Sequence, residues 1–266
     1  NNPDALDLSK GFNIVVGGNT LGRGITFPHL QTVYYCRSSK MPQADTFWQH
    51  SRIFGYDREK ELVRIYIPRT LHSLFVSLNE ANEILIKQIE NGIENIQVIY
   101  PNGIKPTRKN VLDNQYLNMI VGGANMFANN PISQYTKDID SIVEQYINTE
   151  YSDVSAEILI KILKLTGSSV HSDFDSNKYI ACIKALQEKR PTIKYRLIVR
   201  TNRDISKGTG TLLSPTDRRL GDSFKNDITL TIYRVNGSTD KGWDGSPLWI
   251  PNIKFPDGIC FYNIDE

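Results

Sequence analysis

Residues 12–27 read Phe-Asn-Ile-Val-Val-Gly-Gly-Asn-Thr-Leu-Gly-Arg-Gly-Ile-Thr-Phe. The apolar run at 12–16 ends in two glycines, which is typical of a strand covered on both faces that then enters a loop. The alternation continues along the chain, with strands predicted at 32–36 and 62–67 and helices at 43–53 and 71–92. Strands that alternate with helices predict an α/β fold, in which helices cover a parallel sheet.

The rest of the chain changes character twice. Residues 101–108 are rich in Pro, Gly, Lys and Arg, as in a linker or an exposed crossing. Helical patterns follow at 138–147, 154–165 and 176–189, and strand patterns separated by turns follow at 195–199, 228–233 and 258–262. We therefore expect three parts: an α/β part at 1–108, a helical region at 109–190 and a β-rich region at 191–266.

The composition limits the classes of partner. The 31 Lys and Arg residues barely outnumber the 29 Asp and Glu residues, so the net charge of +2 predicts at most a local nucleic-acid patch. Cys36, Cys182 and Cys260 are far apart and odd in number, which predicts free thiols in the cytoplasm. No apolar run is long enough to span a membrane. Because the chain starts without Met and close to a buried-looking strand, we expect an N-terminal portion to be missing.

The glycine-rich segment after the first predicted strand is the first candidate site. Glycines let backbone amides approach a phosphate or a ribose closely, and the polar side chains beside them supply donors. The candidate contacts with a nucleotide or a nucleic acid are Gly18, Asn19, Thr20, Arg23, Gly24 and Thr26. The segment is not a phosphate-binding P-loop, because the chain has no Gly-Lys-Ser/Thr ending. An ordinary glycine turn would explain the segment equally well.

The second candidate site lies just before the third predicted strand. Gln49, Arg52 and Arg58 occur there at the edge of the predicted α/β sheet. An arginine in this place suits the arginine-finger role, in which its guanidinium stabilises charge on a transferring phosphoryl group. Gln49 and Arg52 would share a helix face, so we favour Arg52 as the finger. The alternative is that both arginines only solvate the surface of a helix.

Taken together and in this order, the two segments resemble motifs V and VI in the second RecA-like lobe of superfamily-two helicases. Over residues 12–68 the chain is also similar to the Z-one domain family, through Gly17-Gly18-Asn19, Leu21, Arg23-Gly24, Thr26, Arg37-Ser38, Asp45-Thr46, Gln49, Arg52, Phe54-Gly55-Tyr56, Leu62 and Arg64-Ile65-Tyr66. That family consists of predicted endonucleases attached to a superfamily-two helicase module in prokaryotic restriction or phage-defence proteins. Ser51, Ile53 and Asp57 depart from its pattern, which leaves the choice between the two arginines open.

The resemblance implies the C-terminal fragment of an ATP-dependent, DNA-acting protein of the helicase or endonuclease type. Residues 1–108 would be the C-terminal part of a RecA-like lobe. ATP and Mg²⁺ would be its cofactors and DNA its partner, with the main nucleotide ligands in the missing N-terminal helicase lobe. The alternative is a non-catalytic nucleic-acid-binding or scaffolding module that keeps the shape of the motor lobe.

Cations and apolar residues alternate at the start of the β-rich region. The cations are Lys194, Arg196 and Arg200, and the apolar residues are Tyr195, Leu197 and Val199. A strand here would place the cations on one face, which could either follow a phosphate backbone or be an ordinary solvated face. Arg203, Arg218 and Arg219 would extend the patch if the fold brings them together. Neither the spacing of the His and Cys residues nor the grouping of the acidic residues predicts a metal site.

Overall fold

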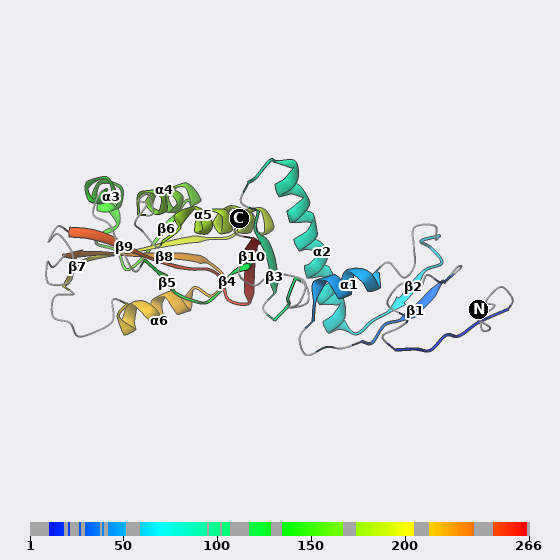
Figure 1. Cartoon of the computed structure of the whole chain (residues 1–266). Coiled ribbons are helices and arrows are strands. Elements are labelled where there is room, and N and C mark those ends of the chain that lie inside the picture. Colours follow the sequence, from blue (N-terminus) through cyan, green and yellow to red (C-terminus); the bar gives the residue numbers. More distant parts are fainter. Residues whose placement is uncertain are drawn as a thin grey trace. The chain divides into compact units, whose positions relative to one another are not determined.

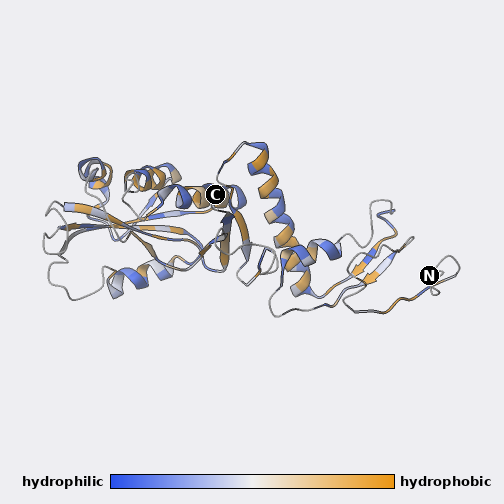
Figure 2. Ribbon diagram, viewed as in Figure 1, coloured by the Kyte–Doolittle hydropathy of each residue, from blue (hydrophilic) through white to orange (hydrophobic). Residues whose placement is uncertain are grey.

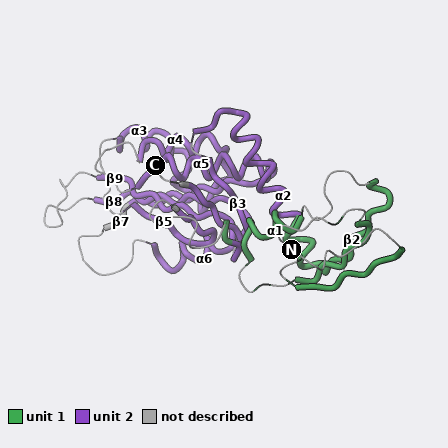
Figure 3. The backbone as a smooth tube through the Cα atoms, turned by 45° about the vertical axis from the view of Figure 1, so that its right-hand side comes forward, with its two compact units in different colours: residues 1–75, 105–108 green, residues 76–104, 109–266 purple. Residues whose placement is uncertain are grey.

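The computed structural model in Figure 1 describes residues 11–18, 21, 27, 30–37, 39, 42–51, 59–94, 96–101, 103–106, 117–128, 135–166, 174–204, 213–236 and 247–264. The chain divides into two compact units (Figure 3). Unit 1 comprises residues 1–75 and 105–108, and unit 2 comprises residues 76–104 and 109–266.

Unit 1 contains a parallel strand pair joined by a helix. Strand β1 (Thr32–Tyr34) pairs in parallel with β2 (Arg64–Tyr66), and helix α1 (Ala44–Ser51) lies between them in the sequence. The buried side of α1 includes Phe47, whose ring packs edge to face on Phe75 at a centroid distance of 5.0 Å. This strand, helix, strand order confirms the parallel arrangement that the sequence predicts for this part.

The run at 12–16 is not the buried strand that its composition predicts. Residues 12–17 have no regular secondary structure, and Phe12, Ile14 and Val16 are almost fully exposed. A strand buried on both faces needs a sheet beside it and cover above and below. The described sheet of unit 1 has two strands, and Tyr34 and Ile65 on them are themselves exposed, so it offers no such cover.

Unit 2 is built on a mixed five-stranded sheet with the order β5-β9-β8-β7-β6. Its strands are β5 (Met126–Phe127), β6 (Ser152–Val154), β7 (Tyr195–Asp204), β8 (Ile228–Asn236) and β9 (Pro247–Lys254). Strands β7 and β8 are parallel, and helix α6 (Pro215–Ser223) connects them, whereas the other neighbours are antiparallel. A second, antiparallel sheet has the order β3-β10-β4, formed by β3 (Val98–Pro101), β4 (Leu117–Val121) and β10 (Ile259–Ile264).

Helices lie on both faces of the five-stranded sheet (Figure 1). One face carries α3 (Thr136–Val143), the 3-10 turn η2 (Glu144–Tyr146), α4 (Ala156–Thr166) and α5 (Ser176–Lys189), and the other face carries α6. The main core lies under α3, α4 and α5, where fully buried Leu159 and Ile183 meet Leu197 of β7. A smaller cluster around Tyr233, Val235 and Leu213 fills the opposite face.

The long helix α2 (Arg69–Glu90) begins in unit 1 and continues into unit 2. Figure 2 shows apolar and polar residues alternating in bands along it. Its buried positions in unit 2 are Leu78, Ala81, Ile84 and Gln88, which recur at the three- and four-residue spacing of one helix face. The predicted helix at 71–92 is therefore confirmed within two residues at each end.

The predicted helices of unit 2 are present, but the region at 109–190 is not purely helical. It also contributes β4, β5 and β6, the last two of which are only two and three residues long. Such short strands leave no periodic pattern in the sequence, because they are held by pairing with distant strands. The chain forms two compact units, and the division into three successive parts stays a prediction.

We expect Gly122→Ala to lower the free energy of unfolding of unit 2 by about 1 to 3 kcal/mol. Gly122 follows β4, and a Cβ at this position would meet the backbone carbonyl of Pro256, which cannot move without shifting the chain before β10. Gly221 provides a matched control, because a Cβ there meets nothing within 4 Å and Ala favours helix α6. Urea unfolding should separate the two variants, and equal losses of stability would contradict the proposed clash.

Candidate functional site

The predicted nucleotide-contacting segment lies largely outside the described residues. Gly18 is exposed, and its carbonyl oxygen accepts a hydrogen bond from the Leu21 amide at 3.2 Å. Asn19, Thr20, Arg23, Gly24 and Thr26 are not among the described residues. Their contacts with nucleotide or nucleic acid therefore stay a prediction.

The second predicted segment is described only in part. Gln49 is half-buried on α1, whereas Arg52 and Arg58 lie outside the described residues. The structure instead shows an arginine whose role the sequence does not reveal. Arg37, three residues after the end of β1, reaches the side chain that follows Gln49 on the helix.

His50 holds Arg37 and Tyr35 in one polar cluster. An Arg37 guanidinium nitrogen lies 2.8 Å from His50 Nε2, and the Tyr35 hydroxyl lies 2.7 Å from His50 Nδ1. A guanidinium can only donate, so Nε2 must accept and therefore carries no proton. The neutral ring then carries its proton on Nδ1 and donates it to the Tyr35 hydroxyl. His50 is only 4% exposed, so neighbouring side chains and not water surround its ring.

Aromatic packing keeps the cluster rigid. The Tyr35 ring packs edge to face on both His50 and Phe75. Burial raises the pKa of Tyr35, and the positive charge of Arg37 only partly opposes this shift, so the hydroxyl stays protonated at neutral pH. Ligands of open α/β sheets bind outside the carboxyl ends of parallel strands, which is where Arg37 lies relative to β1. The remaining guanidinium nitrogens suit planar, bidentate contact with a phosphate.

The predicted alternation in β7 is confirmed, but its polar face is not simply solvated. Tyr195, Leu197 and Val199 are buried with the main core. On the other face Ile198 is fully buried and Arg196 is only 9% exposed, whereas Lys194, just before the strand, is exposed. The burial of this face is incompatible with the solvated alternative for Arg196.

Carboxylates hold both arginines of β7. Arg196 Nε lies 2.9 Å from the Asp227 carboxylate, its Nη1 contacts Asp153, and its guanidinium lies against the rings of both Tyr151 and Phe224. Arg200 Nε lies 2.8 Å from buried Asp217, and its Nη2 donates to the carbonyl of Glu150. These contacts occupy the donors that a phosphate would need. Binding of DNA by Arg196 and Arg200 stays a prediction, and the geometry favours a structural role for them.

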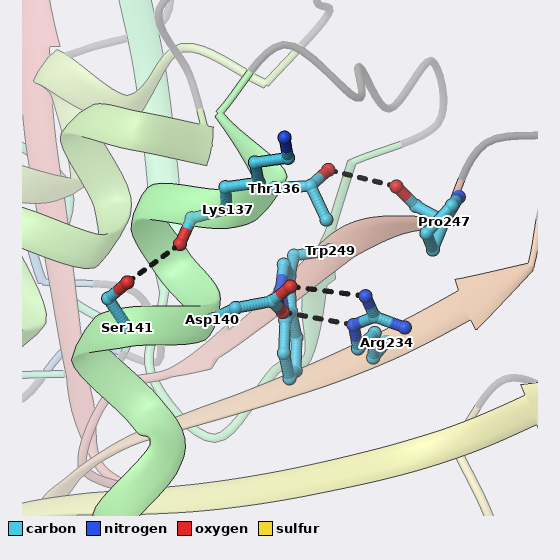
Figure 4. A network of polar contacts seen from close by, with 7 residues as sticks. All are labelled: Thr136, Lys137, Asp140, Ser141, Arg234, Pro247 and Trp249. Atoms are coloured by element: carbon cyan, nitrogen blue, oxygen red, sulfur yellow. Dashed lines mark hydrogen bonds and ion pairs between the residues drawn. The ribbon is translucent and has the colours of Figure 1, made fainter.

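A third polar cluster fastens α3 to the sheet (Figure 4). The Asp140 carboxylate accepts two hydrogen bonds from Arg234 of β8, at 2.9 and 3.1 Å, and one from the Trp249 indole at 2.8 Å. Thr136, one turn earlier on α3, donates to the Pro247 carbonyl. Burial raises the pKa of Asp140, but the hydrogen bonds and the charge of Arg234 outweigh it and hold the pKa below its ordinary value of 3.8.

The described residues offer neither a metal cluster nor a membrane span. No group of three or more His, Cys, Asp or Glu side chains in the described ranges could hold a metal ion. None of the helices described is long and apolar enough to cross a membrane. The predicted free thiols agree with the structure, in which Cys36 is exposed and Cys182 and Cys260 are buried.

Because the pKa of Asp140 is lower in the folded chain, its ion pair stabilises the fold above pH 3.8 and ceases to do so as the pH falls through the folded value. We expect Asp140→Asn to lower the free energy of unfolding at neutral pH, and the difference from the wild type to shrink in acid. Urea unfolding at several pH values measures this. Asp138→Asn on the same helix is the control, since Asp138 is exposed and is not one of the hydrogen-bond partners of Asp140. A difference that does not depend on pH would contradict the assignment.

Comparison with known proteins gives two family matches. The family model of the Z1 domain matches residues 1–111, which confirms the similarity to the Z-one domain family, although helicase motifs V and VI stay a prediction. The family model of the C-terminal domain of the restriction endonuclease CglI H-subunit matches residues 120–257. A solved structure of the C-terminal domain from the H subunit of CglI restriction endonuclease is 31% identical, with a TM-score of 0.45, and the match covers 52% of this chain and 99% of that chain.

No curated protein matches the chain. The two family matches do not overlap, and the second includes β5 to β9, with all of α3, α4, α5 and α6. Because that second match spans just over half of the chain, the protein belongs to the family of C-terminal domains of the restriction endonuclease CglI H-subunit and is associated with restriction systems.

Proposed function

We propose that this chain is part of an ATP-dependent, DNA-acting motor of a restriction system. The observation that carries the proposal is the Tyr35, His50 and Arg37 cluster at the carboxyl end of β1, in the unit that matches the Z1 domain. It presents an oriented guanidinium next to a parallel strand pair, as a phosphate-binding cleft requires. In this proposal unit 1 is part of a RecA-like lobe, and Arg52 or Arg58 acts as the arginine finger.

ATP and Mg²⁺ are the cofactors of the proposed motor. Arg37 fits a phosphate oxygen, because its guanidinium is held by a neutral acceptor and not by a carboxylate that would cancel its charge. The described residues offer no set of metal ligands, so Mg²⁺ would be held by the phosphates and by the other lobe. That lobe would also supply the phosphate-binding loop, since this chain has no Gly-Lys-Ser/Thr sequence.

A non-catalytic nucleic-acid-binding or scaffolding module is the second candidate. In unit 2 the ion pairs of Arg196, Arg200 and Arg234 fasten helices and loops to the sheet, which is a structural role that both candidates allow. The two candidates differ in turnover. The motor hydrolyses ATP in the intact protein and residues 1–266 alone do not, whereas the module lacks ATP turnover in both.

Arg52→Ala in the intact protein should lower the rate of ATP turnover strongly and leave nucleotide affinity nearly unchanged. A finger contacts charge that develops in the transition state, so its loss affects kcat more than ground-state binding. Arg69→Ala, an exposed change at the start of α2 in the same unit, should leave both quantities unchanged. Equal losses of affinity and rate would make Arg52 a ground-state ligand or a structural residue.

For Arg37 we expect even the conservative change to lysine to lower ATP turnover. Arg37→Lys keeps the charge but loses the planar fork that contacts His50, so we expect turnover to fall by about tenfold or more even with the conservative change. Steady-state ATPase assays of Arg37→Lys and Arg37→Ala, each with a urea unfolding curve, test this. Full activity of Arg37→Lys with unchanged stability would show that only the charge matters and would remove the oriented contact from the proposal.

A further inference from the structure

Helix α6 is firmly placed on its face of the sheet. The Ser214 side chain caps its N-terminus by accepting from the Asp217 amide at 3.1 Å, and Pro215 occupies the first turn. Asp217 and Gly221, four residues apart, are buried and so define the side of α6 that faces the sheet. Arg219 is two residues from each of them, which places it on the opposite side of the helix.

The carboxylates of this segment pair with cations of the sheet. Three acidic residues of α6 and the turn after it each pair with a buried or half-buried cation of β7 or β9. The pairs are Asp217 with Arg200 at 2.8 Å, Asp222 with Lys254 at 2.7 Å and Asp227 with Arg196 at 2.9 Å. Lys254 is only 4% exposed and also donates to the Gly221 carbonyl. The acidic charge of the segment is therefore balanced by cations of the sheet.

The cations of the same segment remain on the outside. Arg218, Arg219 and Lys225 are exposed, and none of them takes part in an ion pair recorded among the described residues. Lys194 is also exposed, and its carbonyl accepts a hydrogen bond from the amide of Ile228, three residues after Lys225. Arg218 and Arg219 lie on α6, and Lys225 follows the C-terminal end of that helix.

We propose that this outer face, the α6 basic face of Arg218, Arg219, Lys225 and Lys194, contacts the phosphate backbone of duplex DNA. The inference rests on the proposed DNA-acting function and names the surface of unit 2 that serves it. Each exposed cation can neutralise one phosphate, and duplex DNA carries one phosphate per strand for about every 3.4 Å of its axis. Such contacts neutralise phosphates without reading bases, so the face binds DNA independently of sequence.

The structure separates two sets of cations that composition does not distinguish. Arg196, Arg200 and Lys254 stabilise the fold by pairing with carboxylates, and the α6 basic face is available to a polyanion. A duplex is favoured over an acidic protein surface because the proposed function acts on DNA, whose phosphates exposed cations can neutralise. Binding to an acidic protein in place of DNA is an outcome that the experiment can detect.

The test is the triple variant Arg218→Ala, Arg219→Ala and Lys225→Ala in the intact protein. Affinity for a duplex of unrelated sequence is measured without ATP at several salt concentrations. Each phosphate contact that is lost should flatten the slope of log K against log salt by about 0.9. The matched control removes three exposed lysines from the opposite face of the sheet, Lys161→Ala, Lys164→Ala and Lys184→Ala on α4 and α5, and should leave the slope unchanged.

A flatter slope in the triple variant alone, with normal urea unfolding, supports the α6 basic face. An unchanged slope in the triple variant overturns the proposal, and so does equal flattening in the control variant. The proposal also fails if the triple variant keeps its DNA affinity but loses binding to an acidic protein. ATP turnover of the wild type and of Arg52→Ala is measured separately and reports on the proposed motor. The two proposals can therefore fail independently. Normal ATP turnover with an unchanged salt slope would support the motor and reject DNA binding by the α6 basic face. No ATP turnover with a flatter slope would reject the motor and support DNA binding by the face.

Discussion

Strands β7 and β8 run parallel, so the chain must return over the sheet between them, and α6 makes that crossing. The crossing covers a face of the sheet that carries Arg196, Arg200 and Lys254. A buried charge is tolerated only with a partner, and the segment from α6 to the start of β8 supplies one carboxylate for each cation. The topology of one strand pair thus decides which charges of the segment are structural and which reach the surface.

Periodicity predicts those parts of unit 2 that are long enough to show it. Helix α5 has the bounds that its spacing predicts, and β7 shows the alternation of buried residues. Strand β9 could not be found this way, because Pro247 and Pro251 argue against a strand in the interior of a sheet. The burial of Arg196 could not be predicted from the sequence either, because its partners Asp153 and Asp227 lie 43 and 31 residues away along the chain.

In unit 1 the sequence indicates the segment that holds the candidate site but only some of the residues that form it. Arg37 belongs to the pattern shared with the Z-one domain family, but nothing in its local sequence indicates an acceptor for its guanidinium. His50 becomes that acceptor because α1 follows β1 and brings its last turn back to the end of the strand. The histidines are scattered in the sequence, and a contact that the fold creates leaves no spacing rule in the chain.

The pairing of Arg200 with buried Asp217 limits how these two positions can change in evolution. Loss of one partner leaves an uncompensated charge under α6, whereas replacement of both by apolar residues of similar volume can be nearly neutral. Single steps away from the pair are therefore disfavoured, and the two positions should change together among relatives. Arg218 and Arg219, whose side chains are exposed beside the pair, are not subject to this coupling and can vary with the partner that the surface meets.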